Sequence, residues 1–190
     1  VFPMTDTGNA EYLAYLHGSE VRYDHRRQRW LWWSIHRWEP DCDGHITQLA
    51  MRAARDRYER ASTIIDLKAR QQAANWAITS ESRQKIDACI SLAGNIKPIS
   101  DNGENWDFNP WLLGVHNGVV DLKTGELRPG RYEDRITMRT GVDLNGQAKC
   151  PRWEQFLTEI FSDPDLVDWI HRALGYSITG DVSEQCIFLG

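Results

Sequence analysis

Cysteine is scarce in this sequence, and the few cysteines are far apart. The four are Cys42, Cys89, Cys150 and Cys186, and no two of them form a C-x-x-C pair. This spacing disfavours a structural zinc site, and reduced thiols are the usual state of such cysteines in the cytosol. No apolar run approaches the roughly 20 residues that cross a bilayer, and the first residues do not resemble a signal peptide. We therefore predict a cytoplasmic protein without a membrane partner.

Signatures of catalysis are also missing. The sequence has no nucleophile elbow, no H-E-x-x-H motif and no paired histidine and aspartate. Three histidines stand alone and are typical of surface or packing residues: His45, His116 and His171. Three acidic residues lie in the irregular stretch 98–110: Asp101, Glu104 and Asp107. Their spacing matches no calcium loop, so we predict a solvated linker there. We predict no catalytic residue, no metal and no cofactor in this chain.

The composition is that of an ordinary globular protein, and its charge is uneven. The 190 residues, 41% of them hydrophobic, fit one large domain or two small ones. Residues 1–100 hold 14 Lys+Arg and 12 Asp+Glu, a net charge of +2, whereas residues 101–190 hold 8 and 15, a net charge of −7. A positive half and a negative half are expected of a module that binds an anionic partner on one face, or of a head-to-tail assembly. Such a difference in net charge also arises by chance.

Residues 1–43 are predicted to form a helix followed by a tryptophan-rich β-meander. Asp6 or Thr7 can cap a helix that ends at Gly18. Residues 21–39 then show the short alternating runs of three strands. Within them, Trp30 and Trp32 are expected on one face of the sheet, and Leu31 and Trp33 on the other. One face must be core, and the other would expose aromatic rings beside arginines.

Two interpretations of this meander remain open. Arginine beside exposed rings is the chemistry of a platform for single-stranded nucleic acid, where bases stack and phosphates are neutralised. The candidate nucleic-acid-binding residues are therefore Arg26, Arg27, Arg29, Arg37, Trp32 and Trp33, followed by Arg52 and Arg55 on the next helix. Alternatively, the meander packs on helices, and the arginines cover ring faces by cation–π contact.

Residues 44–97 are predicted to form a helical subdomain. Helices are expected at 45–61, at about 64–79, and from Ser80 or Ser82 to Gly94. In the second of these, four residues are expected to be partly buried: Leu67, Ala74, Trp76 and Ile78. Consecutive helices with short joints indicate a helical bundle or a helix-turn-helix-like unit.

Residues 98–190 are predicted to combine a β-hairpin with a helical pair. The hairpin spans 117–129, where Gly125 can take a positive φ in the turn. Further extended pieces are expected at 136–138 and 142–144, then a helix from Pro151, a helix at 165–174 that Gly175 stops, and a strand at 187–189. The fold class is thus α+β, mainly helical, with a small N-terminal meander and a central hairpin. Its parts are residues 1–43, 44–97 and 98–190.

Three motifs in the second half carry a resemblance to a known family. They are N-G-V-V-D-L-K-T-G-E-L-R-P at 117–129, C-P-R-W at 150–153 and L-G-Y-S-I-T-G-D at 174–181. Together they resemble the domain immediately preceding the superfamily-3 (AAA+) helicase domain in phage/plasmid and poxvirus-type primase–helicases. Upstream, T-D-T-G-N-A at 5–10 is similar to the segment before this domain in phage and plasmid members. The resemblance covers nearly the whole chain.

The resemblance implies a non-catalytic pre-helicase (collar) domain of a DNA replication protein from a mobile genetic element. In that family the strand 186–189 leads into a P-loop, whose first glycine would be Gly190, so the chain is expected to stop before the phosphate-binding lysine. ATP and Mg²⁺ are expected only for the parent, an ATP-dependent DNA helicase/primase. The implied partners are single-stranded DNA, the protein's own helicase domain and further copies in a homo-hexamer. The alternative is a purely structural oligomerisation or partner-docking module without DNA affinity, which the acidic second half favours.

Overall fold

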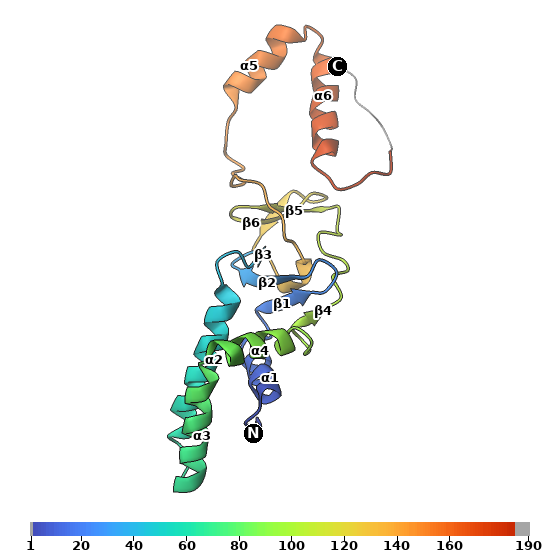
Figure 1. The fold of residues 1–190 in the computed structure, drawn as a ribbon. Helices are drawn as coiled ribbons and strands as arrows, with labels where there is room; N and C mark the ends of the chain where they lie inside the picture. The colour runs from blue at the N-terminus through green and yellow to red at the C-terminus, as the bar shows by residue number, and fades with distance from the viewer. Residues whose placement is uncertain (1, 185–190) are drawn as a thin grey trace. The chain divides into compact units, whose positions relative to one another are not determined.

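The computed structural model describes residues 2–184, and the chain divides into two compact units (Figure 1). The first unit is formed by Val1–Ser34 and Trp38–Glu104, and the second by Ile35–Arg37 and Asn105–Gly190. Helices and small sheets together make the α+β fold that the sequence predicts. The strand expected at 187–189 lies outside the described residues, as does the glycine at position 190.

The first unit opens with a capped helix and the meander. Its elements in chain order are α1 (Asp6–His17), β1 (Val21–Asp24), β2 (Arg29–Ser34), β3 (Arg37–Pro40), α2 (His45–Ala61), α3 (Leu67–Ser80), α4 (Arg83–Ala93) and β4 (Ser100–Asp101). Strands β1 to β3 confirm the predicted meander. The predicted cap of α1 is wrong, because the hydroxyl of Thr5 accepts the N–H of Gly8 at 3.0 Å. The helix ends before Gly18, as predicted.

The sheet of the first unit has the strand order β3-β2-β1-β4. Strands β1 and β2 are antiparallel, whereas the short strand β4 runs parallel to β1. The N–H of Tyr23 donates to the carbonyl of Ile99 at 2.8 Å, and the N–H of His25 donates to that of Asp101 at 2.9 Å. Ile99 is 0% exposed. The predicted solvated linker at 98–110 is therefore wrong at its start, because this backbone completes the sheet.

The core of the first unit lies between the sheet and the helices α1, α2 and α4. Val21 is opposite Trp32 and Tyr23 is opposite Trp30, so these four side chains share one face of the sheet. On that face Trp30 and Trp32 are partly buried against the apolar cluster of the helices. The α2 stripe that enters this core is Ile46, Leu49, Ala50, Ala53, Ala54 and Ala61. Each fully buried large side chain contributes roughly 1.5–3 kcal/mol.

Helices α2 and α3 lie side by side (Figure 1). Helix α2 spans the predicted 45–61, but α3 begins three residues later than predicted, because the Asp66 carboxylate caps it by accepting the N–H of Ala69 at 2.7 Å. The burial predicted for this helix is partly wrong. Leu67 is 65% and Ile78 is 56% exposed, and the residues buried in the helix are Ala77 and Ser80.

The second unit is built on an antiparallel sheet of order β5-β6-β7. Its elements are β5 (Leu112–Val115), β6 (Gly118–Asp121), β7 (Glu126–Arg128), η1 (Tyr132–Asp134), α5 (Pro151–Ile160) and α6 (Pro164–Ser177). Strands β6 and β7 confirm the predicted hairpin, and Gly125 has a φ of +74° in its turn. Residues 136–138 and 142–144 form no strands, because their backbone hydrogen bonds do not form a ladder with a neighbouring strand. The Thr137 N–H, for example, donates to the Asp107 carboxylate.

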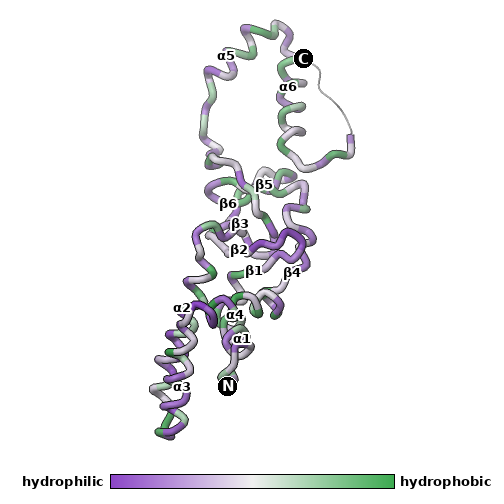
Figure 2. The backbone as a smooth tube through the Cα atoms, viewed as in Figure 1, coloured by the Kyte–Doolittle hydropathy of each residue, from purple (hydrophilic) through white to green (hydrophobic). Residues whose placement is uncertain are grey.

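Helices α5 and α6 bury few side chains. Proline opens both helices, as expected for the first turn. Leu157 is the buried residue of α5, and none of the residues of α6 is buried. Apolar and polar residues alternate along both helices (Figure 2). Gly175 does not stop α6, which continues to Ser177. None of the helices within residues 2–184 combines the length and apolarity needed to cross a bilayer.

Candidate nucleic-acid interface

A buried carboxylate organises the turn between β1 and β2. Asp24, the last residue of β1, is 0% exposed. It accepts hydrogen bonds from the Arg27 backbone N–H at 3.1 Å and from Arg27 Nη1 at 3.2 Å, and it faces Arg29 Nε at 3.4 Å. Because a buried carboxylate needs such donors, Asp24 holds Arg27 and Arg29 in one arrangement. We call Asp24, Arg26, Arg27 and Arg29 the Asp24 cluster.

A distant loop closes this cluster. The Gly103 carbonyl accepts from Arg27 Nη1 at 2.9 Å, and the Gly103 N–H donates to Asp101 Oδ1 at 2.8 Å. Gly103 has a φ of +80°, and a Cβ at this position would collide with Asp24 Oδ1. Sequence reasoning missed this role and treated Asp101 as part of a linker. The available signal was the Asn102-Gly103 dipeptide, which is typical of a tight turn.

The Asp24 cluster carries a net positive charge. Three arginines surround one carboxylate, which gives a net charge of +2. Arg27 and Arg29 side chains are 43% and 31% exposed, so both guanidinium groups reach the surface. Arg26 is exposed, and within residues 2–184 it makes no hydrogen bond or ion pair. Each guanidinium has five N–H donors, so donors remain for phosphate oxygens.

The tryptophans of the meander are used in packing. Trp32 stacks on His45 with ring centroids 4.4 Å apart, and Trp33 meets Trp38 edge-on at 5.5 Å. The guanidinium of Arg22 lies 4.9 Å from the Trp38 ring centroid. These contacts have the form of the alternative interpretation, in which arginine covers ring faces. The two candidate stacking residues, Trp32 and Trp33, are both half-buried.

The other candidate arginines are dispersed. Arg37 counts with the second unit, where its Nη1 donates to the Thr137 carbonyl at 2.9 Å. Arg52 and Arg55 are exposed on α2, and Arg55 Nε pairs with Glu81 at 3.2 Å. The structure therefore brings Arg26, Arg27 and Arg29 together and leaves the remaining three arginines apart from them.

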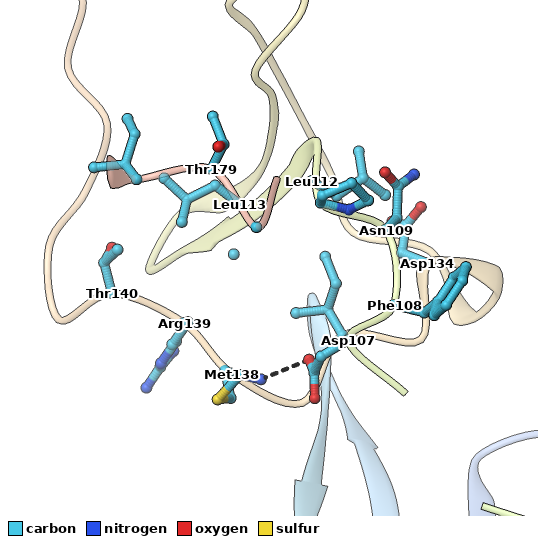
Figure 3. A pocket seen from close by; sticks show the side chains of 15 residues that line it. Asp107, Phe108, Asn109, Leu112, Leu113, Asp134, Met138, Arg139, Thr140 and Thr179 are labelled. Atoms are coloured by element: carbon cyan, nitrogen blue, oxygen red, sulfur yellow. Dashed lines mark hydrogen bonds between the residues drawn. The ribbon is translucent and has the colours of Figure 1, made fainter. Parts of the chain in front are cut away.

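The second unit contains an open pocket of about 390 Å³ between β5 and the segment after α6 (Figure 3). Asp107 lies at its wall and accepts from Thr137 N at 2.6 Å, from Thr137 Oγ1 at 2.5 Å and from Met138 N at 3.3 Å. The Gly180 N–H donates to the Pro110 carbonyl at 2.9 Å. The Thr179-Gly180 pair of the third sequence motif therefore has a packing role in this wall.

The second carboxylate of this pocket is already paired. Asp134 receives two hydrogen bonds of 2.7 Å from Arg128. Burial raises the pKa of Asp134, but the Arg128 guanidinium and the Arg131 N–H lower it by more, so it lies below its ordinary value. Within residues 2–184, no group of three or more His, Cys, Asp and Glu side chains is placed to hold a metal ion.

Comparison with known proteins gives two matches. Residues 10–162 match the family model described as "D5 N terminal like". The chain is also 21% identical over 192 residues to the protein "Putative helicase L207/L206" of Acanthamoeba polyphaga mimivirus. This match covers 89% of the chain and 19% of the viral protein, so the chain spans about a fifth of the length of that relative.

Proposed function

This chain belongs to the D5 N terminal like family of primase–helicases, and we propose that it is the non-catalytic pre-helicase collar of a DNA replication helicase. In this proposal it contacts single-stranded DNA and supports assembly of the helicase ring. The longer protein would be an ATP-dependent, superfamily-3 helicase or primase, active as a homo-hexamer with ATP and Mg²⁺. The mimivirus relative, whose name includes the word helicase, supports this context.

The Asp24 cluster is the observation that carries the DNA contact. Arg26 and Arg27 lie in one tight turn, Arg29 opens the strand that follows it, and the buried Asp24 neutralises only one of the three charges. A cation that meets a phosphate releases condensed counterions, which favours binding at low salt. Because Asp24 holds two of the guanidinium groups in place, part of the entropy cost of ordering them is already met by the fold.

A salt titration of DNA binding tests this proposal. Fluorescence anisotropy with a labelled oligothymidine is expected to show binding that weakens as salt rises. The Arg26→Ala/Arg27→Ala pair is expected to weaken binding and to reduce the slope of log K against log salt by roughly 1.4, or 0.7 for each lost phosphate contact. The matched control is Arg83→Ala/Arg131→Ala, which removes two exposed arginines elsewhere. Equal binding by both double variants would argue against the site.

The second candidate function is a structural docking module without DNA affinity. Residues 150–184 hold 2 Lys+Arg and 7 Asp+Glu, a net charge of −5, which repels DNA. Trp153, Phe156 and Trp169 are also 38%, 46% and 48% exposed, as expected of a surface that contacts protein. This candidate predicts no oligothymidine binding even at low salt, together with self-association that sedimentation velocity would detect.

We also propose that these 190 residues neither hydrolyse ATP nor bind it tightly. The sequence contains no G-x-x-x-x-G-K-[ST] motif, so the lysine that reaches the phosphates and the hydroxyl that holds Mg²⁺ are missing. A phosphate-release assay on the purified chain is expected to give the background rate. Robust turnover that co-purifies with the chain would contradict this part of the proposal.

A further inference from the structure

An open groove of the first unit is lined by aromatic rings and arginines. It has a volume of about 430 Å³ and lies beside α1, the end of α2 and the start of the α2–α3 connection. Residues that matter for its chemistry are Phe2, Tyr12, Tyr15, Arg57, Arg60 and Ile64. This volume is within the range of small-ligand sites. We call this feature the Tyr15 groove.

The aromatic wall of the Tyr15 groove presents one ring to solvent. Phe2 lies 5.1 Å from Tyr12 and 5.4 Å from Tyr15 between ring centroids, and the two tyrosine rings are nearly parallel at 19°. Tyr12 is 3% exposed, whereas Tyr15 is 67% exposed. The inner rings therefore support the outer ring, and Tyr15 offers the open aromatic surface that Trp32 and Trp33 do not.

The cations of the groove outnumber its carboxylates. Arg57 donates to the carbonyls of Phe2 at 3.2 Å, Pro3 at 3.1 Å and Gly8 at 3.2 Å, which are neutral acceptors. Burial lowers the pKa of Arg57, because its charged form loses hydration there. An anion that entered the groove would restore part of that lost stabilisation.

A second arginine, Arg60, lines the groove, and Arg70 lies next to it through a hydrogen bond to a lining residue. Arg60 Nε pairs with Asp56 at 2.7 Å, and the same carboxylate accepts from the Tyr12 hydroxyl. Arg70 Nε donates to the carbonyl of Ile64, a lining residue, at 2.7 Å. Asp56 pairs with Arg60, and Asp66 caps the helix that carries Arg70. Three arginines, at positions 57, 60 and 70, thus stand against two carboxylates, which leaves a net charge of +1 around the rings.

We propose that the Tyr15 groove binds unpaired nucleotides of a single strand, with a base stacked on Tyr15 and phosphates near Arg57, Arg60 and Arg70. This inference rests on the proposed DNA contact and adds a stacking site distinct from the Asp24 cluster. Base–aromatic stacking does not depend on base identity, so the contact suits a protein that holds any sequence. The excess of arginine favours a polyanion over an apolar peptide as the occupant.

The decisive variants change the exposed ring alone. Tyr15→Ala is expected to weaken binding of labelled oligothymidine by roughly 5- to 150-fold, the range for loss of one stacked base. The slope against salt is expected to stay unchanged, because no charge is removed. Tyr15→Trp is expected to retain binding, since indole also stacks. Tyr58→Ala is the matched control, because Tyr58 is 50% exposed on α2 and lines no part of the groove.

A charge variant supplies the complementary readout. Arg70→Gln is expected to reduce the slope of log K against log salt by roughly 0.7, the value for one phosphate contact. Lys68→Gln, at an exposed neighbouring position, is expected to leave this slope unchanged. Full binding by Tyr15→Ala and Arg70→Gln, beside a loss in Arg26→Ala/Arg27→Ala, would overturn the groove and leave the proposed function standing. An equal loss in Tyr15→Ala and Tyr15→Trp would overturn stacking. Absence of binding by the unmodified chain at low salt would overturn both proposals.

Discussion

Replacing Asp24 by asparagine tests whether the buried carboxylate holds the first unit together. Asp24→Asn keeps the size of the side chain and an acceptor for the Arg27 N–H, but it removes the charge that faces Arg27 and Arg29. Breaking a fully buried ion pair costs about 3–5 kcal/mol. Here the arginine side chains are 43% and 31% exposed, so water partly replaces the lost partner. We therefore expect a smaller loss of unfolding free energy, about 1–2 kcal/mol.

Urea denaturation followed by tryptophan fluorescence measures this loss. Four of the nine tryptophans lie at positions 30–38, so part of the signal reports on the sheet that contains Asp24. The matched control is Asp87→Asn, which breaks an exposed pair with Arg83 at 3.7 Å in which the side chains are 66% and 96% exposed. Exposed pairs contribute at most about 1 kcal/mol, and commonly less. Equal midpoints for Asp24→Asn and the unmodified chain would refute the argument that burial makes this carboxylate important.

Two further predictions concern the glycine that closes the Asp24 cluster and the carboxylate that caps α2. Gly103→Ala is expected to destabilise the first unit by about 3 kcal/mol or more in the same urea assay, because the added Cβ would collide with Asp24 and because the φ of +80° disfavours alanine. Gly125→Ala is the comparison: its φ is +74° but its surroundings are open, so the expected loss is only about 1–2 kcal/mol. The Asp41 carboxylate caps the start of α2 by accepting the N–H groups of Gly44, His45 and Ile46 at 2.9, 2.8 and 3.0 Å. Burial raises the pKa of Asp41, but these N–H groups lower it by more, so the pKa lies below its ordinary value. Its cap therefore stabilises the fold at neutral pH and is lost as the pH falls through the lowered value. Asp41→Ala is expected to cost about 1 kcal/mol at pH 7, and a urea series from pH 7 downward should show the two proteins converge in acid.

Helices and turns whose formation depends on residues close together in the sequence were predicted correctly. The apolar stripe of α2 specified that helix over its whole length, and Lys123-Thr124-Gly125 specified the turn of the hairpin. The starts of α1 and α3 differ from the prediction, because each is set by a single capping side chain, Thr5 and Asp66. Gly175 remains helical in α6 because a glycine within a helix costs only about 1 kcal/mol.

Features that join distant segments were not predictable from local pattern. Asp24 belongs to an ordinary strand pattern, and its role depends on Arg29 across the sheet and on a loop near position 103. The Tyr15 groove likewise combines residues near position 2 with residues near position 60. The sequence did predict that arginines and aromatic rings share the first half, and it chose Trp32 and Trp33, which are half-buried in ring contacts with His45 and Trp38.

The parallel pairing of β4 with β1 has a consequence for synthesis of the chain. Tyr23 pairs with Ser100 and Asp24 with Asp101. The strands β1 and β4 are therefore neighbours in the sheet, although β2, β3 and the helices α2, α3 and α4 lie between them in the chain. On a ribosome, β1 would keep an unpaired edge until residue 101 has emerged, and exposed edges invite pairing with other chains. Arg26 and Arg27, in the turn that follows β1, would carry positive charges next to that edge during this interval, and like charges oppose pairing with a second copy of the chain.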